Sequence, residues 1–470
     1  MELPVRCFVK AVRRCFLSYI CLAVFCGCLM GIALIQMIDG SFKMDIFERK
    51  QNVTKPRTTT LETPVHISPL RMKELAAKRA NKTDLKQKWL NERIERLNKA
   101  AQKVQMRREV TARPVEPSDK FHIFYYAWYE NVQYDGNWQH WNHEYLKNWR
   151  KLDTKVYPTG KHEPPDDIGS NFYPSLGCYS SRDPITIDIH MKQIRDAGVG
   201  VLIVSWYPPG LSDGAGRSSD LIFSDLLNAA NRHKLKVAPH IEPYNGRNPV
   251  NFLTHLKYFV RSYGNHPALY KVKKNGKEST VYYIYDSYRT PASSWKELLS
   301  PKGNISIRGS AQDGVFLGLL VDVHHKHEIK RAHFDGFYTY FASNGFSYGS
   351  TWKNWKTLSV YAHKNGLLFS PSIGPGYIDT RVRPWNSGNT RHRRRGKYYD
   401  VGWRTAISAG ADFFSITSFN EWHEGTQIEP AIPKSTNGYT YMDYEPEGPN
   451  FYLNLTNWWV NEVLNKTVHF

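Results

Sequence analysis

The sequence predicts an α/β fold, a (β/α)8 barrel, for the part of the chain that begins near residue 118. Apolar runs of strand length recur from about residue 120, segments with helical periodicity separate them, and there are eight such runs. Strands that alternate with helices form a parallel sheet, and eight strand–helix units close into a barrel. A doubly wound open sheet is the alternative, although no glycine-rich phosphate loop follows the first run.

The predicted strands are nearly continuous apolar runs, which is typical of strands that are buried on both faces. They are Phe121–Ala127, Gly200–Ser205, Lys236–His240, Val281–Tyr285, Gly314–Leu320, Gly336–Tyr340, Leu367–Pro371 and Asp412–Thr417. The helices predicted between them include Ile187–Ala197, Leu221–His233, Pro249–Tyr263, Trp352–Asn365 and Tyr399–Ala409. Together they assign residues 118–470 to one catalytic domain.

The N-terminal region predicts a membrane anchor. Residues 15–38 carry no charge, and as a helix they would reach about 36 Å, enough to cross a hydrocarbon core of about 30 Å. Four basic residues precede them, so the positive-inside rule leaves residues 1–14 as a cytosolic tail and places the rest in the lumen. A cleaved signal peptide is the alternative, but its apolar region is shorter than this one.

Residues 39–117 are interpreted as a stem between the anchor and the barrel. Residues 52–64 are rich in Thr and Pro, and residues 70–110 are rich in charged residues with a short heptad pattern. Five N-x-S/T sequons agree with a protein of the secretory pathway. They begin at Asn52, Asn81, Asn304, Asn454 and Asn465.

The charge distribution argues against nucleic acid as a partner, although the net charge is +20. Residues 1–117 hold 23 Lys and Arg against 11 Asp and Glu, so more than half of the surplus lies outside the predicted barrel. One dense basic run remains, Arg391–Lys397, which is interpreted as a solvated loop or a contact with acidic glycans. Five of the six cysteines lie in the first 28 residues, so Cys178 has no disulfide partner within the predicted barrel.

Polar and aromatic residues follow the predicted strands, where a (β/α)8 barrel carries its active site. Because the carboxyl ends of parallel strands meet at one rim, we expect these side chains to converge. The candidates are Tyr126, Trp206, Tyr207, Asp213, Glu242, Tyr340 and Arg383, followed by Asn420, Glu421, Trp422 and Glu424 after the eighth strand.

Glu421 and Glu424 are the predicted catalytic pair. Glycoside cleavage needs a proton donor for the leaving oxygen and a second carboxylate, and two Glu on one helical turn could face the same sugar ring. The spacing also allows that only one of them is catalytic, with Glu242 as the second group. Histidines such as His140, His143 and His423 could bind a metal, but their spacing matches no established zinc motif. We therefore predict no metal and no cofactor.

Four motifs resemble the endo-α-1,2-mannosidases of glycoside hydrolase family 99. They are Phe124–Tyr129, Val204–Pro209, His240–Tyr244 and Ser415–Gly425, and the last is the most specific. The tail, anchor and stem also resemble the animal Golgi members of that family. The resemblance implies a metal-independent, retaining barrel enzyme in the Golgi membrane. Its substrates would be high-mannose N-glycans that carry glucose, from which it would release glucosyl-mannose.

The resemblance also implies the roles of individual residues. Glu421 would deprotonate the mannose 2-hydroxyl, which attacks the anomeric carbon to form a 1,2-anhydro sugar, and Glu424 would act as general acid and then as base. Trp206 and Tyr207 match the family's wall around the outer sugar, and Tyr126, Tyr340 and Arg383 match binding positions. A catalytically silent, lectin-like glycan receptor on the same barrel is the alternative. A glycosyltransferase is disfavoured because the chain contains no D-x-D motif.

Overall fold

The computed structural model describes residues 113–147, 157–214, 218–436 and 438–465. The predicted tail, anchor and nearly all of the stem lie outside them. Among the described residues, no helix is both long enough and apolar enough to traverse a bilayer. The strands are β1 (Ser118–Tyr125), β2 (Val199–Trp206), β3 (Lys236–Ile241), β4 (Lys271–Lys274), β5 (Lys277–Ile284), β6 (Gly314–Leu319), β7 (Gly336–Tyr338), β8 (Leu368–Ser370), β9 (Ser372–Ile373) and β10 (Phe414–Ile416).

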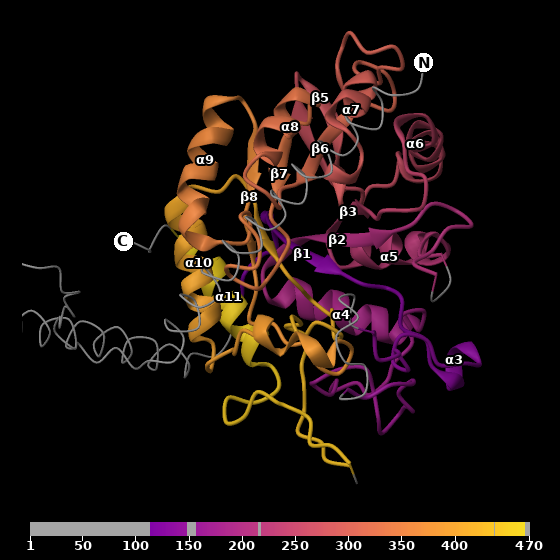
Figure 1. Cartoon of the computed structure of the whole chain (residues 1–470), viewed down its shortest axis with the longest axis vertical. Helices are drawn as coiled ribbons and strands as arrows, with labels where there is room; N and C mark the ends of the chain where they lie inside the picture. The colour runs from indigo at the N-terminus through magenta and orange to yellow at the C-terminus, as the bar shows by residue number, and fades with distance from the viewer. Residues whose placement is uncertain (1–112, 148–156, 215–217, 437, 466–470) are drawn as a thin grey trace, which may run out of the picture. The chain divides into compact units, whose positions relative to one another are not determined.

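Helices separate these strands and lie around them (Figure 1). They are α3 (Val132–Asp135), α4 (Pro184–Asp196), α5 (Asp220–Arg232), α6 (Pro249–Tyr263), α7 (Ala292–Leu299), α8 (His325–Arg331), α9 (Trp355–Lys364), α10 (Lys397–Ala409) and α11 (Phe451–Leu464). Short 3-10 segments occupy Ser287–Arg289, Trp352–Asn354 and Pro384–Asn389.

The strands form a nearly closed parallel barrel. Their order is β8-β7-β6-β5-β3-β2-β1-β10-β9, and every neighbouring pair in it is parallel. The two ends of this order, β8 and β9, are separated in the chain by Pro371 alone, which has no N–H to give to a ladder. Counted as one interrupted strand, they give eight wall strands. This arrangement is consistent with the predicted (β/α)8 barrel and unlike an open doubly wound sheet.

Each predicted strand overlaps an observed wall strand, and each helix named above overlaps an observed helix. Several elements were missed: β4, which pairs with β5 as an antiparallel hairpin, and α3, α7, α8 and α11. Helix α8 is short and polar, and α11 has buried residues on most of its circumference, so neither shows the one-sided apolar pattern that identifies a surface helix.

Helices α4 and α6 begin at capping side chains. The Asp183 carboxylate accepts hydrogen bonds from the first turn of α4, and Pro184 occupies the first helical position. At α6, Asn248 and Asn251 form a reciprocal capping box. Because each helix begins after the carboxyl end of a strand, these caps fix helix starts on the rim that carries the candidate site.

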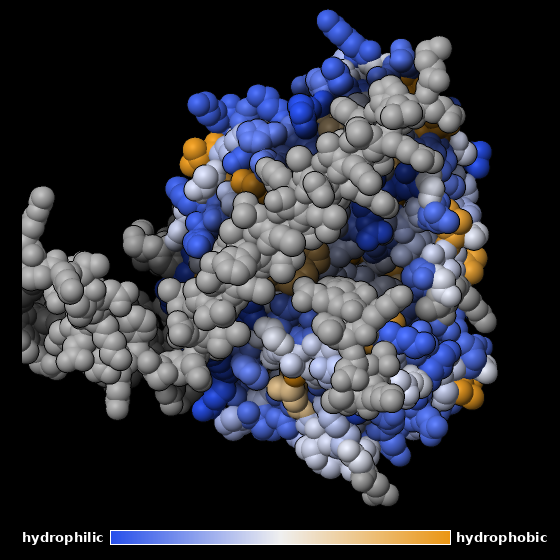
Figure 2. Space-filling model, viewed as in Figure 1, coloured by the Kyte–Doolittle hydropathy of each residue, from blue (hydrophilic) through white to orange (hydrophobic). Residues whose placement is uncertain are grey.

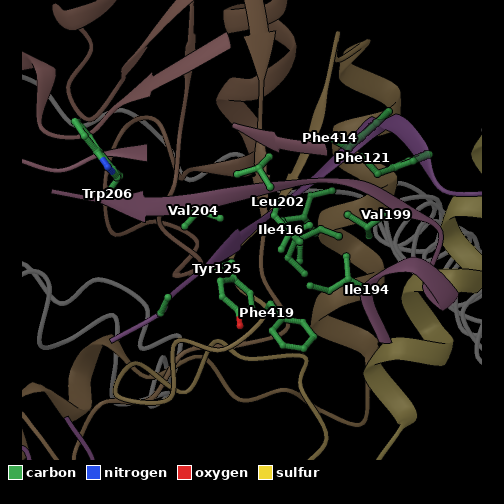
Figure 3. Packing of buried hydrophobic residues seen from close by; sticks show 14 of the residues in the cluster. Phe121, Tyr125, Ile194, Val199, Leu202, Val204, Trp206, Phe414, Ile416 and Phe419 are labelled. Atoms are coloured by element: carbon green, nitrogen blue, oxygen red, sulfur yellow. The ribbon is translucent and has the colours of Figure 1, made fainter. Parts of the chain in front are cut away.

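Alternate residues of the strands face two different cores. In β2, Leu202 and Val204 pack outward against the helices, whereas Val201 and Ile203 fill the barrel interior. In β1, Tyr125 faces outward and stacks on Phe419, 5.7 Å between ring centroids, as Figure 3 shows. The outward core therefore reaches the segment that carries Glu421 and Glu424.

Hydrophilic residues cover most of the described surface in the view of Figure 2, and hydrophobic residues appear on it in separate places. The exposed large apolar side chains include Ile185, Leu221 and Val250, which lie in the first turns of three different helices. Scattered apolar side chains are normal on a folded protein. This face therefore offers no reason to look for function away from the barrel rim.

Candidate active site

Glu421 and Glu424 lie beyond the carboxyl end of β10 on a hydrogen-bonded turn, not on a helix. The Gly425 N–H donates to the Trp422 carbonyl at 3.2 Å, and the Thr426 N–H donates to the Glu421 carbonyl at 3.3 Å. Gly425 has a φ of +57°, and a Cβ there would lie 2.7 Å from the Ile378 carbonyl oxygen. Glycine is therefore required for the turn to close beside Glu424.

The Glu421 carboxyl is buried and accepts a hydrogen bond from a backbone N–H. The residue is 4% exposed, and its Oε1 accepts a hydrogen bond from the His423 N–H at 3.2 Å. Burial raises the pKa of Glu421 well above its usual value, and the charges of Glu424 and Glu242 raise it further, whereas Arg383 and the His423 N–H lower it in part. Glu421 therefore holds a proton strongly unless a ligand stabilises its anion.

The Glu424 carboxyl is more open and lies beside a cation. Its side chain is 23% exposed, and its Oε1 lies 3.6 Å from Nη1 of Arg383. Burial raises the pKa of Glu424, whereas the Arg383 guanidinium lowers it. Glu424 can therefore exchange a proton with a leaving group or with water more readily than Glu421 can.

A buried aspartate holds Arg383 in place. Oδ2 of the fully buried Asp379 accepts hydrogen bonds from Arg383 Nη1 at 3.1 Å, from Tyr377 Oη at 2.8 Å and from Asn386 Nδ2 at 2.9 Å. Arg383 thus lies between the carboxylates of Asp379 and Glu424. The pair of acids fixes the position of the guanidinium from both sides.

Glu242 and two tyrosines face the same space. Glu242 follows β3, is 6% exposed, and places Oε1 3.3 Å from Nδ1 of His240. The hydroxyls of Tyr126 and Tyr340 are in direct hydrogen-bond contact. Burial raises the pKa of Tyr126, as do the charges of Glu421 and Glu242. Both tyrosine hydroxyls therefore stay protonated; one donates to the other, and the second can donate to a ligand oxygen.

Three candidates expected to bind substrate are buried instead, which corrects the sequence-based expectation. Trp206 is 1% exposed, and its Nε1 donates to Asp220 Oδ1 at 2.9 Å. Trp422 is fully buried, and its Nε1 donates to Glu429 Oε2 at 2.9 Å. Trp206 shares the outward face of β2 with Leu202 and Val204, so the period of two already predicts that it points to the helices.

Asn420, the third of these, connects the catalytic turn to β1. It is fully buried, its Oδ1 accepts from the Tyr126 N–H at 2.8 Å, and its Nδ2 donates to the Tyr126 carbonyl at 2.8 Å. These paired bonds fix the turn against the strand that carries Tyr126. Asn420 therefore positions the site and does not line it.

Tyr207 and Asp213 lie after β2, on the side of Glu242. Tyr207 is half-buried; burial raises its pKa, as do the charges of Glu242 and Asp213. Asp213 Oδ2 lies 3.2 Å from Nε2 of His140. The structure thus brings both predicted residues to the edge of the site.

The histidines predicted as possible metal ligands form a group of neighbouring, mutually tilted rings. His423 lies 4.7 Å from His143 and 5.7 Å from His140, between ring centroids. Burial lowers the pKa of His423 well below its usual value, so the ring is neutral. No group of three or more His, Cys, Asp or Glu side chains within the described parts of the chain has an arrangement that could hold a metal ion.

Three site residues were absent from the sequence-based candidates. Tyr377 and Asp379 hold or flank Arg383, and Tyr285 lies 5.0 Å from Tyr340 between ring centroids. The charge of Glu424 contributes to raising the pKa of Tyr285, after burial, so this hydroxyl also faces the site. The signal for Asp379 was its place four residues before Arg383, a common spacing for an ion pair.

The opposite end of the barrel contains a cavity of about 790 Å³. Its lining comes from the starts of β5 to β8, and two of its basic side chains are paired: Lys274 with Asp335 at 2.6 Å, and Arg308 with Asp313 at 2.9 Å. Paired charges have little left to offer a ligand. Glu421 and Glu424, two neighbouring carboxyl groups in different surroundings at the other end, are therefore the better candidates for catalysis.

The comparisons with known proteins agree with this location. The model of glycosyl hydrolase family 99 matches residues 117–465. The rat glycoprotein endo-alpha-1,2-mannosidase is 52% identical over 353 residues, which cover 75% of this chain and 76% of that protein. The human glycoprotein endo-alpha-1,2-mannosidase-like protein is 49% identical over 346 residues, covering 73% of this chain and 76% of that protein.

A solved structure is similar as well. The GH99 endo-alpha-mannosidase from Bacteroides thetaiotaomicron superimposes with a TM-score of 0.69 at 42% sequence identity. The match covers 75% of this chain and 100% of that one. The residues matched by the family model include the whole described barrel and the turn that carries the two carboxyls.

Proposed function

Because this chain belongs to glycosyl hydrolase family 99, we propose that it is a retaining endo-α-1,2-mannosidase that releases glucosyl-mannose from glucosylated high-mannose N-glycans. One observation carries the proposal. Two carboxyl groups share one turn at the barrel rim, one buried and hydrogen-bonded to a backbone N–H and the other beside Arg383. The relatives named as endo-alpha-1,2-mannosidases supply the linkage.

In the first step, Glu421 removes the proton from the 2-hydroxyl of the mannose on the non-reducing side of the scissile bond. The resulting O2 attacks the anomeric carbon, the bond from that carbon to the leaving oxygen breaks, and Glu424 gives its proton to the leaving oxygen. The product of this step is a 1,2-anhydro sugar that remains attached to glucose.

In the second step, the Glu424 carboxylate takes a proton from water, and the hydroxide adds to the anomeric carbon. The bond between that carbon and O2 breaks, and Glu421 returns its proton to O2. Each step inverts the anomeric centre, so the product retains the α-configuration. The partly exposed Glu424 suits a group that must reach both leaving group and water, and the buried Glu421 suits one that serves the substrate alone.

This sequence needs Glu421 ionised and Glu424 protonated when the bond breaks. In the empty site burial favours the protonated form of Glu421. A sugar 2-hydroxyl that donates to Glu421 stabilises its anion, which moves the shared proton toward Glu424. Substrate binding therefore sets the protonation state that the reaction uses.

The rim residues suit recognition of the two sugars that are released. Tyr126 and Tyr340 present protonated hydroxyls, and Arg383 and Glu242 present charges that can bind sugar hydroxyls. Tyr207, near Glu242, supplies the wall around the outer glucose. Trp206 supports this wall from behind and does not touch the sugar.

The decisive experiment is digestion of a glucosylated high-mannose N-glycan by residues 113–470, with product mass and anomer read together. Release of glucosyl-mannose in the α-anomer is expected, and neither a chelator nor added divalent metal should change the rate. The control is Glu421→Gln, which keeps the fold and the shape of the site. A protein that binds the glycan without releasing a disaccharide would be the lectin-like receptor.

We also propose that the protein resides in the Golgi membrane, with residues 1–14 in the cytosol, 15–38 as anchor, 39–117 as stem and the barrel in the lumen. The charge-free stretch and the basic residues before it support this arrangement. Protease treatment of sealed vesicles that contain the full chain should leave the barrel intact. Digestion of the barrel in sealed vesicles would reject the orientation.

A further inference from the structure

The basic run Arg391–Lys397 is built into the barrel by some of its arginines. Arg391 Nε donates to the Asn344 carbonyl at 3.0 Å, and Arg395 Nε donates to Glu447 Oε1. Arg393 is only 9% exposed, whereas Arg394 is exposed. The interpretation of this run as a wholly solvated loop is therefore wrong, since Arg393 points inward.

Arg393 is enclosed by three aromatic rings. Its guanidinium carbon lies 4.6 Å from the centre of Phe172, 4.9 Å from that of Tyr444 and 4.6 Å from that of Tyr452. Ring faces attract a cation, and several of them together offset part of the cost of burying its charge. Such an enclosure leaves the guanidinium little freedom to move.

The enclosed guanidinium holds the backbone of the catalytic turn. Arg393 Nη2 donates to the carbonyl of Gly425 at 3.0 Å and to that of Gln427 at 2.7 Å. Gly425 directly follows Glu424. The two bonds therefore fix the backbone of the turn immediately after Glu424.

The segment from Arg391 to Arg393 also fixes the loop that carries Arg383. The backbones of Arg391 and Tyr377 pair, with N–H to carbonyl distances of 2.8 and 3.0 Å, and the Ile378 N–H donates to the Glu424 carbonyl at 2.8 Å. Arg391 to Arg393 thus connects to both neighbours of Glu424: the turn on one side and the Arg383-bearing loop on the other.

We propose that Arg393 is a positioning residue for the general acid, which holds Glu424 at the distance from the leaving oxygen that proton transfer requires. The inference rests on the proposed function, because it presupposes that Glu424 protonates the leaving group. It predicts that loss of the Arg393 guanidinium lowers the rate most for substrates whose leaving group must be protonated.

The test compares two substrates in kcat/KM, which reports the first irreversible step. One is a glucosylated high-mannose N-glycan, whose leaving oxygen needs a proton; the other is glucosyl-mannosyl fluoride, whose leaving group needs little help. Arg393→Met should lower kcat/KM about 10- to 100-fold for the glycan, with the loss in kcat and not in KM. For the fluoride it should stay within about threefold of wild type.

The matched control is Arg394→Met, which removes the same charge from the exposed neighbour and should change neither substrate's rate. Glu424→Gln serves as the reference for a missing acid, with a large loss for the glycan and a small one for the fluoride. Arg393→Lys keeps a charge among the rings and is the second variant if Arg393→Met does not fold. It should show the same bias toward the fluoride, to a smaller extent.

Two results would overturn the proposal. One is full activity on the glycan in either folded Arg393 variant. The other is an equal loss for both substrates, which is what general weakening of the fold produces. Failure of the proposed function looks different, because the wild-type protein would then not cleave the glycan, or Glu424→Gln would show no bias between the substrates.

Discussion

The two ends of one short turn place chemically identical groups in opposite surroundings. Glu421 is 4% exposed and accepts a hydrogen bond from the His423 N–H, whereas the Glu424 side chain is 23% exposed and lies 3.6 Å from Arg383. Only two residues separate them. The difference arises from direct contacts. The Asp379–Arg383 pair, after β9, places its guanidinium against Glu424, whereas Arg383 and Glu242 act on Glu421 only through their charges.

This difference teaches how one turn can supply a base and an acid. A buried carboxyl with no cation in direct contact holds its proton until a ligand stabilises its anion, so it can serve the substrate's own hydroxyl. A partly exposed carboxyl beside a guanidinium stays in exchange with solvent, so it can pass a proton to a leaving group and recover it from water. The predictions below test this division from the largest expected effect to the smallest.

The largest effect is expected from the two amide variants. Glu421→Gln and Glu424→Gln should each lower kcat on the glycan by about 10³-fold, because each removes a proton transfer from the rate-limiting chemistry. Azide should rescue Glu424→Gln with glucosyl-mannosyl fluoride, since azide opens the anhydro sugar without a base. The measurement is initial rate with product analysis.

Azide rescue can also contradict the proposed division of roles between the two carboxyls. If Glu421 were a nucleophile on carbon, azide would rescue Glu421→Gln instead and give a product of inverted configuration. Azide rescue with inversion in that variant would show that the reaction passes through a glycosyl-enzyme and not through an anhydro sugar. Glu421 would then not be the proposed base.

A smaller effect is expected at Arg383. Arg383→Met should lower kcat/KM about 10- to 100-fold, because the guanidinium binds near the reacting sugar. It should also shift the alkaline limb of the pH–rate profile to higher pH. The sign follows because Arg383 lowers the pKa of Glu424. Without the cation, the Glu421–Glu424 pair keeps its shared proton to higher pH. An unmoved or lowered limb would contradict the assignment.

Asp379 gives the opposite sign and a smaller loss. Its charge raises the pKa of Glu424, although burial contributes more, so Asp379→Asn should shift the alkaline limb to lower pH. Asparagine keeps the shape and can still accept from Arg383 and Tyr377, so the loss in kcat should be only about tenfold. Shifts of the same sign in the Asp379 and Arg383 variants would show that neither acts through its charge.

The barrel and its rim could be predicted because buried strands appear in the sequence as apolar runs and because the active-site residues of such a barrel follow the carboxyl ends of its strands. Apolar runs identified all eight wall strands, and the E-x-x-E spacing placed Glu421 and Glu424 together. The direction in which a single side chain points was harder to predict. Trp206 was expected to contact substrate, yet it packs outward and donates to Asp220 on α5, a helix whose position the strand pattern does not specify.

Long-range partners explain the other omissions. Arg393 lies among rings from Phe172 and from the C-terminal residues Tyr444 and Tyr452, and it holds a carbonyl more than 30 positions along the chain. In the sequence it is one basic residue in a basic run. Only the folded chain distinguishes it from the exposed Arg394.

The smallest expected effect is a gain in stability, and it separates the two carboxyls most directly. Burial raises the pKa of Glu421 in the folded chain, so the folded protein disfavours the ionised form that the unfolded chain adopts freely. Glu421→Gln removes this cost and keeps the hydrogen bond from the His423 N–H. It should raise the free energy of unfolding at neutral pH by about 1 kcal/mol, measured by thermal or urea unfolding.

The pH dependence of that gain has a defined sign. Below the usual carboxyl pKa of 4.5, wild type and Glu421→Gln both carry a neutral group, so their stabilities should converge. The gain should grow as the pH rises from there through the raised pKa of the folded state. Glu424→Gln should gain less, because it leaves Arg383 without one of its two carboxylate neighbours. Equal gains would mean that burial and the cation do not distinguish the two ends of the turn.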